Sequence, residues 1–136
     1  MISSSPNFQR SRNSSTSLET VVAALKSATT AADVWVLHEI DPQALLRRGG
    51  IEIAPARQLL FFHPRYMKRL LDADPAAGLE APLKFLILTD GTGAVVRWFD
   101  PVASFGRYDN EALRSLGLEL SVLCQQIADA ALADAP

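Results

Sequence analysis

The apolar positions of this chain repeat with helical spacing near both of its ends. The first set predicts an amphipathic helix from Thr16 to about Thr29, where Thr16 and Glu19 have the spacing of a capping box. The second set predicts a long helix from about residue 109 to Ala131, and its regular three-and-four spacing fits packing against the domain's own sheet. The apolar seam of that helix consists of Leu113, Leu116, Leu120, Leu123, Ile127 and Ala130.

Between these helices, short apolar runs have the length and composition of β-strands. Such runs occupy residues 34–40, 58–62, 83–89 and 94–99. The last two flank Asp90-Gly91-Thr92-Gly93, and a four-residue turn of this composition predicts a β-hairpin.

Four prolines follow a residue whose side chain can accept a hydrogen bond. An acceptor at the N-cap and a proline at the first helical position are typical of helix starts. We therefore predict a short helix or a helical turn at each of these pairs. The pairs are Asp41-Pro42, His63-Pro64, Asp74-Pro75 and Asp100-Pro101.

The two ends of the chain differ from its middle. Residues 1–15 are rich in Ser, Asn and Arg and almost lack apolar side chains, so we expect a flexible N-terminal tail. Residues 133–136 are expected to form a C-terminal tail. The remaining residues, 16–132, are enough for one domain with a single core.

Composition narrows the classes of partner. The formal net charge of -2 gives no general attraction to nucleic acid, and no apolar run is long enough to cross a membrane, so we expect neither partner. One cysteine, Cys124, excludes an internal disulfide, and its place among apolar residues predicts a buried, inert thiol. No apolar secretory segment is visible at the N-terminus, and these features together predict a cytoplasmic protein.

Several residues in their order and spacing resemble the domain of unknown function 302 family, across about residues 18–130. They are Asp41, Pro55, Phe61, Pro64, Gly78-Leu79, Pro82-Leu83-Lys84, Gly93 and Asp100-Pro101. The resemblance implies an α+β domain in which an antiparallel sheet carries helices on one face, including a long C-terminal helix, similar to the TATA-box-binding-protein-like folds. It also implies a homodimer, and it implies no activity.

The chain departs from that family's pattern at two positions. Pro42 stands where the family usually has a histidine after the aspartate, and Phe62-His63 stands where it usually has Gly-Asn. If those polar positions line a site in the family, the site is changed here. His63 can replace the lost histidine only if the two strand ends lie side by side.

The candidate residues for acid/base or metal chemistry are His38, Asp41 and His63. Histidine titrates near neutral pH and a carboxylate can orient it. The competing interpretation is that Asp41 and His63 are helix N-caps and that His38 is an ordinary strand residue. We favour capping, because Asp-Pro recurs where caps are needed, and we predict no metal and no cofactor.

The function that we predict is a non-enzymatic homodimer that binds a small apolar or anionic ligand between its sheet and its helices. The predicted lining residues are Trp35, Phe62, His63 and Trp98, of which the tryptophans can equally be core residues. One alternative is a metal-dependent or acid/base enzyme that uses His63 with Asp41 or His38. Another is a structural docking subunit whose function is dimerisation itself.

Overall fold

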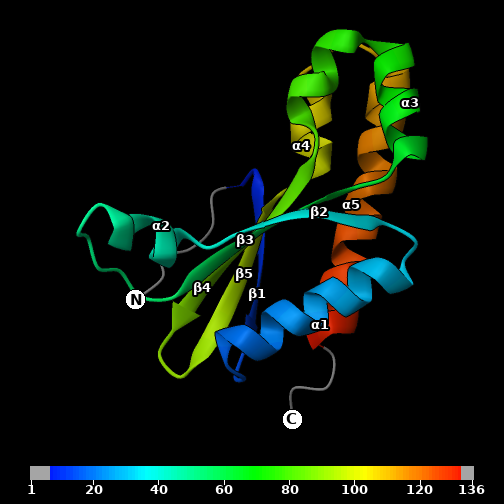
Figure 1. The fold of residues 1–136 in the computed structure, drawn as a ribbon. Coiled ribbons are helices and arrows are strands. Elements are labelled where there is room, and N and C mark those ends of the chain that lie inside the picture. Colours follow the sequence, from blue (N-terminus) through cyan, green and yellow to red (C-terminus); the bar gives the residue numbers. More distant parts are fainter. Residues whose placement is uncertain (1–6, 133–136) are drawn as a thin grey trace.

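A five-stranded antiparallel sheet forms the centre of the molecule (Figure 1). The computed structural model describes residues 7–132. The order of strands across the sheet is β1-β5-β4-β3-β2, and each neighbouring pair is antiparallel. The strands are β1 (Gln9–Ser14), β2 (Trp35–Ile40), β3 (Ala56–Phe62), β4 (Leu83–Asp90) and β5 (Gly93–Phe99).

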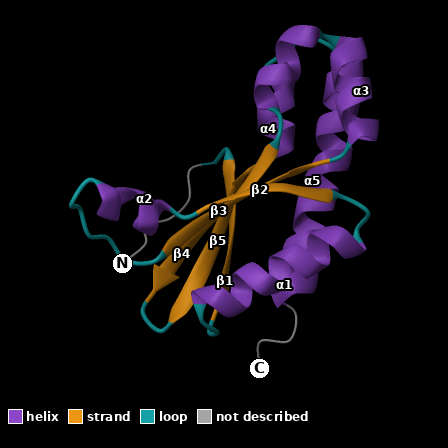
Figure 2. Ribbon diagram, in the orientation of Figure 1, coloured by secondary structure: helices purple, strands orange, loops and turns teal. Residues whose placement is uncertain are grey.

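Two long helices lie on the same side of this sheet (Figure 2). Helix α1 (Leu18–Ala31) contacts β2, β3, β4 and β5, and it packs against α5 (Glu111–Leu132). The predicted α+β class, with an antiparallel sheet and a long C-terminal helix, is therefore confirmed.

Short helices follow the strand ends, as the proline pairs predict. They are α2 (Pro42–Arg48), α3 (Pro64–Ala73), the 3-10 helix η1 (Pro75–Glu80) and α4 (Pro101–Gly106). In each, the residue before the proline accepts a hydrogen bond from a backbone N–H of the first turn, so the predicted capping roles are confirmed. The four capping residues are Asp41, His63, Asp74 and Asp100.

The core lies between the sheet and α1 and α5. At its centre, Phe61 of β3 stacks on Phe85 of β4, and Trp98 of β5 meets Phe85 edge to face. The seam of α5 is buried as predicted as far as Ile127. Ala130, predicted to belong to this seam, is exposed, and Ala131 is buried in its place, because an α-helix drifts from a strict seven-residue repeat.

The expectation of a flexible tail over residues 1–15 is wrong for residues 9–14, which form β1 on the outer side of β5. Strand pairing satisfies backbone groups and needs no apolar side chains, so a polar sequence can occupy this edge. Two ion pairs reinforce it, one from Arg10 to Asp100 and one from Arg12 to Asp129. Residues 1–6 and 133–136 of the expected tails lie outside the described residues.

Two further details differ from the prediction. The N-cap of α1 is Ser17, whose side chain accepts a hydrogen bond from the N–H of Thr20, and not Thr16. Trp35 is not a core residue, since 54% of its surface is exposed. The reason is its place on β2, which is an edge strand of the sheet.

Candidate functional site

A concave apolar surface lies between the edge strand β2 and helix α3. We call it the Trp35 hollow, and its volume is about 530 Å³. Its apolar lining comes from both elements and from the end of β3. The apolar residues are Trp35, Leu37, Phe62, Pro64, Met67 and Leu71.

The backbone explains why so much apolar surface gathers here. The register of β2 on β3 shifts between Val36 and His38, so Leu37 has no partner on β3 and is 50% exposed beside Trp35. Met67 and Leu71 stand four positions apart on α3 and therefore lie on the same face of that helix.

The polar groups of the Trp35 hollow are largely engaged with one another. Nδ1 of His63 accepts the N–H of Arg65, which leaves Nε2 of the neutral ring as its N–H donor. The His63 ring meets Trp35 edge to face at 5.1 Å between centroids. Lys68 donates to Asp72 at 2.8 Å, and this hydrogen bond raises the pKa of Lys68.

Three of the four predicted lining residues therefore meet at one hollow, and the fourth does not. Trp98 lies on β5, three strands from β2, which corresponds to about 14 Å across the sheet. Its side chain is only 4% exposed. Trp98 lines a different hollow of about 220 Å³, at the end of the sheet near α4 and η1.

Cys124 of α5 lies at this second hollow and is buried. Burial raises the pKa of the Cys124 thiol to about 12, and the charge of Asp100 adds to the effect. Because the thiolate is the reactive form, Cys124 is poorly suited to nucleophilic chemistry at neutral pH. Its predicted burial is confirmed.

The structure does not bring together the candidate acid/base residues. Because β2 and β3 are antiparallel, Asp41 lies near Arg57 at the start of β3, whereas His63 follows the end of β3. Six residues of strand separate these positions, or about 20 Å. His38 lies opposite Leu60 and is exposed. Across residues 7–132, no group of three or more His, Cys, Asp or Glu could hold a metal ion.

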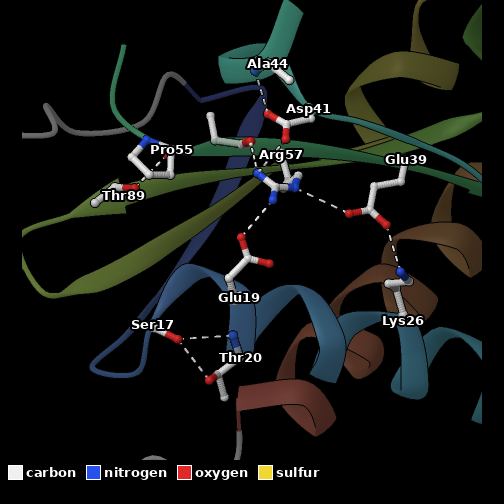
Figure 3. A network of polar contacts seen from close by, with 11 residues as sticks. Ser17, Glu19, Thr20, Lys26, Glu39, Asp41, Ala44, Pro55, Arg57 and Thr89 are labelled. Atoms are coloured by element: carbon white, nitrogen blue, oxygen red, sulfur yellow. Dashed lines mark hydrogen bonds and ion pairs between the residues drawn. The ribbon is translucent and has the colours of Figure 1, made fainter. Parts of the chain in front are cut away.

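Asp41 belongs instead to a charged network around Arg57, which the sequence prediction missed (Figure 3). The Arg57 side chain is 14% exposed and faces Glu19 at 2.7 Å, Glu39 at 3.4 Å and Asp41 at 3.5 Å. Lys26 of α1 also donates to Glu39. The network ties α1 to β2 and β3, and the only sequence signal for it is an arginine at the start of an apolar strand.

No helix within residues 7–132 combines the length and the apolar character that crossing a membrane requires.

The fold and the Trp35 hollow define an antiparallel-sheet α+β domain with an open apolar surface hollow. The family model described as domain of unknown function DUF302 matches residues 10–131, and the chain belongs to this family. The resemblance seen in the sequence is therefore confirmed. The homodimer and the likeness to the TATA-box-binding-protein-like folds stay predictions.

A solved structure supports the same fold. The crystal structure of an uncharacterized conserved DUF302 protein from Bacillus stearothermophilus matches with a TM-score of 0.82 at 17% sequence identity. The match covers 96% of this chain and 100% of that chain. At this identity the likeness concerns the fold alone. A comparison with curated proteins found no match.

Proposed function

We propose that this protein is a non-enzymatic module that binds a small ligand with an apolar body in the Trp35 hollow. The observation that carries the proposal is a half-exposed tryptophan over a concave apolar surface of about 530 Å³. Small-molecule sites typically measure about 300–1,000 Å³ and combine apolar walls with few polar groups. Exposed apolar area of this kind gains about 25 cal/mol per Å² when a ligand covers it.

The polar groups of the Trp35 hollow favour a neutral ligand. Lys68 and Asp72 neutralise each other, so the lining offers no unpaired charge to an ion. His63 keeps one ring N–H, because its Nδ1 accepts a backbone hydrogen bond. We therefore expect an aromatic or aliphatic body that carries one hydrogen-bond acceptor.

The proposal includes a homodimer, which the family resemblance implies. What supports it is the outer edge of β2, which has no strand partner within residues 7–132. A second copy could pair there, beside Trp35 and Leu37. The cytoplasmic location is also part of the proposal, and the single cysteine supports it.

A docking subunit is the second candidate function. It is favoured by Leu118 and Val122, which lie one turn apart on α5 and are exposed. The enzymatic alternative that pairs His63 with Asp41 is not supported, because the two residues lie at opposite ends of β3.

The first experiment is native mass spectrometry of the tag-free protein. We expect a dimer that carries an additional discrete mass from a bound small molecule. A dimer without additional mass would favour the docking subunit, and a monomer would contradict the homodimer.

The second experiment measures binding of two neutral probes, indole and 1-naphthol, by ligand-observed NMR. We expect the variant Trp35→Ser to weaken binding by about tenfold, since an aromatic contact of this size contributes more than about 1 kcal/mol. Leu118→Ser is the matched control, because it removes an equally exposed apolar side chain from α5. Equal weakening by both variants would contradict a site at Trp35.

A further inference from the structure

A second concave region, which we call the Phe99 groove, lies where β4 and β5 meet η1 and α4. Its inner part, of about 220 Å³, is lined by Trp98, Phe99, Lys84 and Cys124 among others. An outer part of about 120 Å³ continues onto the sheet and shares Lys84, Trp98 and Phe99 with the inner part. The two parts therefore meet at these three residues.

The carboxylate in the Phe99 groove is already neutralised. Both oxygens of Glu80 accept from Nη2 of Arg107 at 2.9 Å, and Oε2 also accepts from the Tyr108 hydroxyl at 2.7 Å. These three contacts leave Glu80 little capacity to attract a cationic ligand.

Lys84, in contrast to Glu80, has no partner for its charge among the described residues. Its ammonium group has no hydrogen bond and no ion pair with any residue between 7 and 132. Strand alternation places Leu86 on the same side of the sheet, and Leu86 lies opposite Arg97, which donates to Oε1 of Gln9 at 3.4 Å. The first carboxylate along the same side of β4 is Asp90, six residues or about 20 Å away. Lys84 therefore offers the groove a positive charge that no carboxylate within residues 7–132 pairs with.

The remaining walls suit a flat apolar group. Phe99 is 55% exposed, on the side of the sheet opposite to the buried Trp98, and the ring of Phe8 stacks on it with 6.2 Å between centroids. Trp98 and the protonated thiol of Cys124 form an uncharged inner wall. An apolar cavity of about 150 Å³ accommodates benzene, so the inner part has room for one ring with a short substituent.

We propose that the Phe99 groove binds a small aromatic carboxylate, with the carboxylate at Lys84 and the ring against Phe99. This site is distinct from the Trp35 hollow in position and in the charge of its ligand. A lysine is a point charge that pairs well with a carboxylate, and an exposed aromatic ring adds stacking. Neither proposal depends on the other.

The test compares phenylacetate with phenylacetamide, which has the same shape and no charge. Amide chemical shifts of ¹⁵N-labelled protein are followed during titration with each compound. We expect phenylacetate to shift amides of β4, β5 and α4 and to bind at least about tenfold more tightly than the amide, because a charge-assisted hydrogen bond is lost with the charge. Raising the ionic strength should weaken only the phenylacetate complex.

Four variants make the test specific to this groove. Lys84→Met should abolish the preference for the anion, and Phe99→Ser should weaken both compounds; the amide spectrum of each variant reports whether it is folded. Lys68→Met and Trp35→Ser alter the Trp35 hollow and should leave phenylacetate binding unchanged. The proposal would be overturned if the two compounds bound equally, or if folded Lys84→Met bound phenylacetate with unchanged affinity. It would also be overturned by shifts confined to the Trp35 hollow, or by no binding at about 20 mM phenylacetate, which corresponds to a very weak affinity.

Discussion

The two edge strands of the sheet present opposite surfaces. β1 reads Gln-Arg-Ser-Arg-Asn-Ser, and it is fixed by pairing with β5 and by the ion pairs of Arg10 and Arg12. β2 reads Trp-Val-Leu-His-Glu-Ile, and it leaves Trp35 and Leu37 exposed. A charged edge resists association with other strands, whereas an apolar edge invites it.

This difference indicates which edge is structural and which is available for binding. β1 covers β5, whose residues Val95, Val96 and Trp98 are buried. β2 is the last strand at the other edge of the sheet, and its residues Trp35 and Leu37 line the Trp35 hollow. We therefore expect changes at β1 to act on stability and changes at β2 to act on binding.

Removal of β1 should have the largest effect. A chain that starts at Ser15 leaves the backbone groups of β5 unpaired at a new apolar edge. We expect a loss of more than about 4 kcal/mol in the free energy of unfolding, close to the whole stability of a weak domain. Urea denaturation and light scattering would measure it, with Ser11→Ala as a control. An unchanged urea midpoint would show that β1 is dispensable.

The titration of Cys124 gives a second test of stability on the side of the molecule near β1. Burial raises the pKa of its thiol from about 9.0 to about 12, so the unfolded state loses this proton first. Stability should therefore fall as the pH rises above about 9, by about 3 kcal/mol at pH 11. The measurement is urea denaturation at several pH values.

The control for the alkaline experiment is Cys124→Ala, which removes the titrating thiol. Its unfolding free energy should decline less steeply between pH 9 and pH 11 than that of the parent protein. Parallel curves, or rapid reaction of native Cys124 with Ellman's reagent at pH 8, would contradict the raised pKa.

Gly93→Ala should have an intermediate effect, because it forces β1 and β5 apart. A Cβ atom at Gly93 would lie 2.2 Å from the carbonyl oxygen of Ser14, so the backbone must move. We expect a loss of about 2 kcal/mol, as for other overpacked positions, measured by thermal unfolding. Gly106→Ala is the control, since its Cβ would meet no atom within 4 Å. Similar losses in both variants would mean that the contact with Ser14 is not the cause.

Asp100→Ala should cost less, about 1 kcal/mol, because it removes the cap of α4 and the partner of Arg10. Arg10→Ala should change stability by only a few tenths of a kcal/mol, since Arg10 is half exposed. Chemical denaturation of both variants separates the cap from the ion pair. Equal losses would mean that the ion pair with Arg10, and not the cap of α4, accounts for the effect of Asp100→Ala.

Trp35→Ser should have a similarly small effect on stability, within about 0.5 kcal/mol, because its side chain is exposed on an edge strand. Its neighbour Phe62 is buried, and Phe62→Ala should cost about 3 kcal/mol by the same measurement. If Trp35→Ser destabilised the protein by more than about 1.5 kcal/mol, the contrast between the two edges would fail.

The features that could be predicted from the sequence are those that neighbouring residues determine. Asp41 and Asp100 cap helices because each has a proline after it and backbone N–H groups within two or three residues. The β4–β5 hairpin likewise follows from the Asp90-Gly91-Thr92-Gly93 run, of which Gly91 and Thr92 form the turn between the strands. Such interactions form within a few positions, so their pattern is visible in one sequence.

The features that were missed depend on distant partners. β1 is a strand because β5 offers it an edge, and nothing in its own polar residues indicates this. Trp35 is exposed because β2 has no strand beyond it. The separation of His63 from Asp41 follows from the antiparallel pairing of β2 with β3, and the apolar runs do not specify strand direction.

The pairing of β1 with β5 also has a consequence for the timing of synthesis. Gln9 and Phe99 lie 90 positions apart in the chain. At about 5–20 residues per second, a ribosome needs roughly 5–18 s to make the partner of a strand that has already emerged. During that interval β1 must remain unpaired, and its polar residues keep it from associating with neighbouring nascent chains.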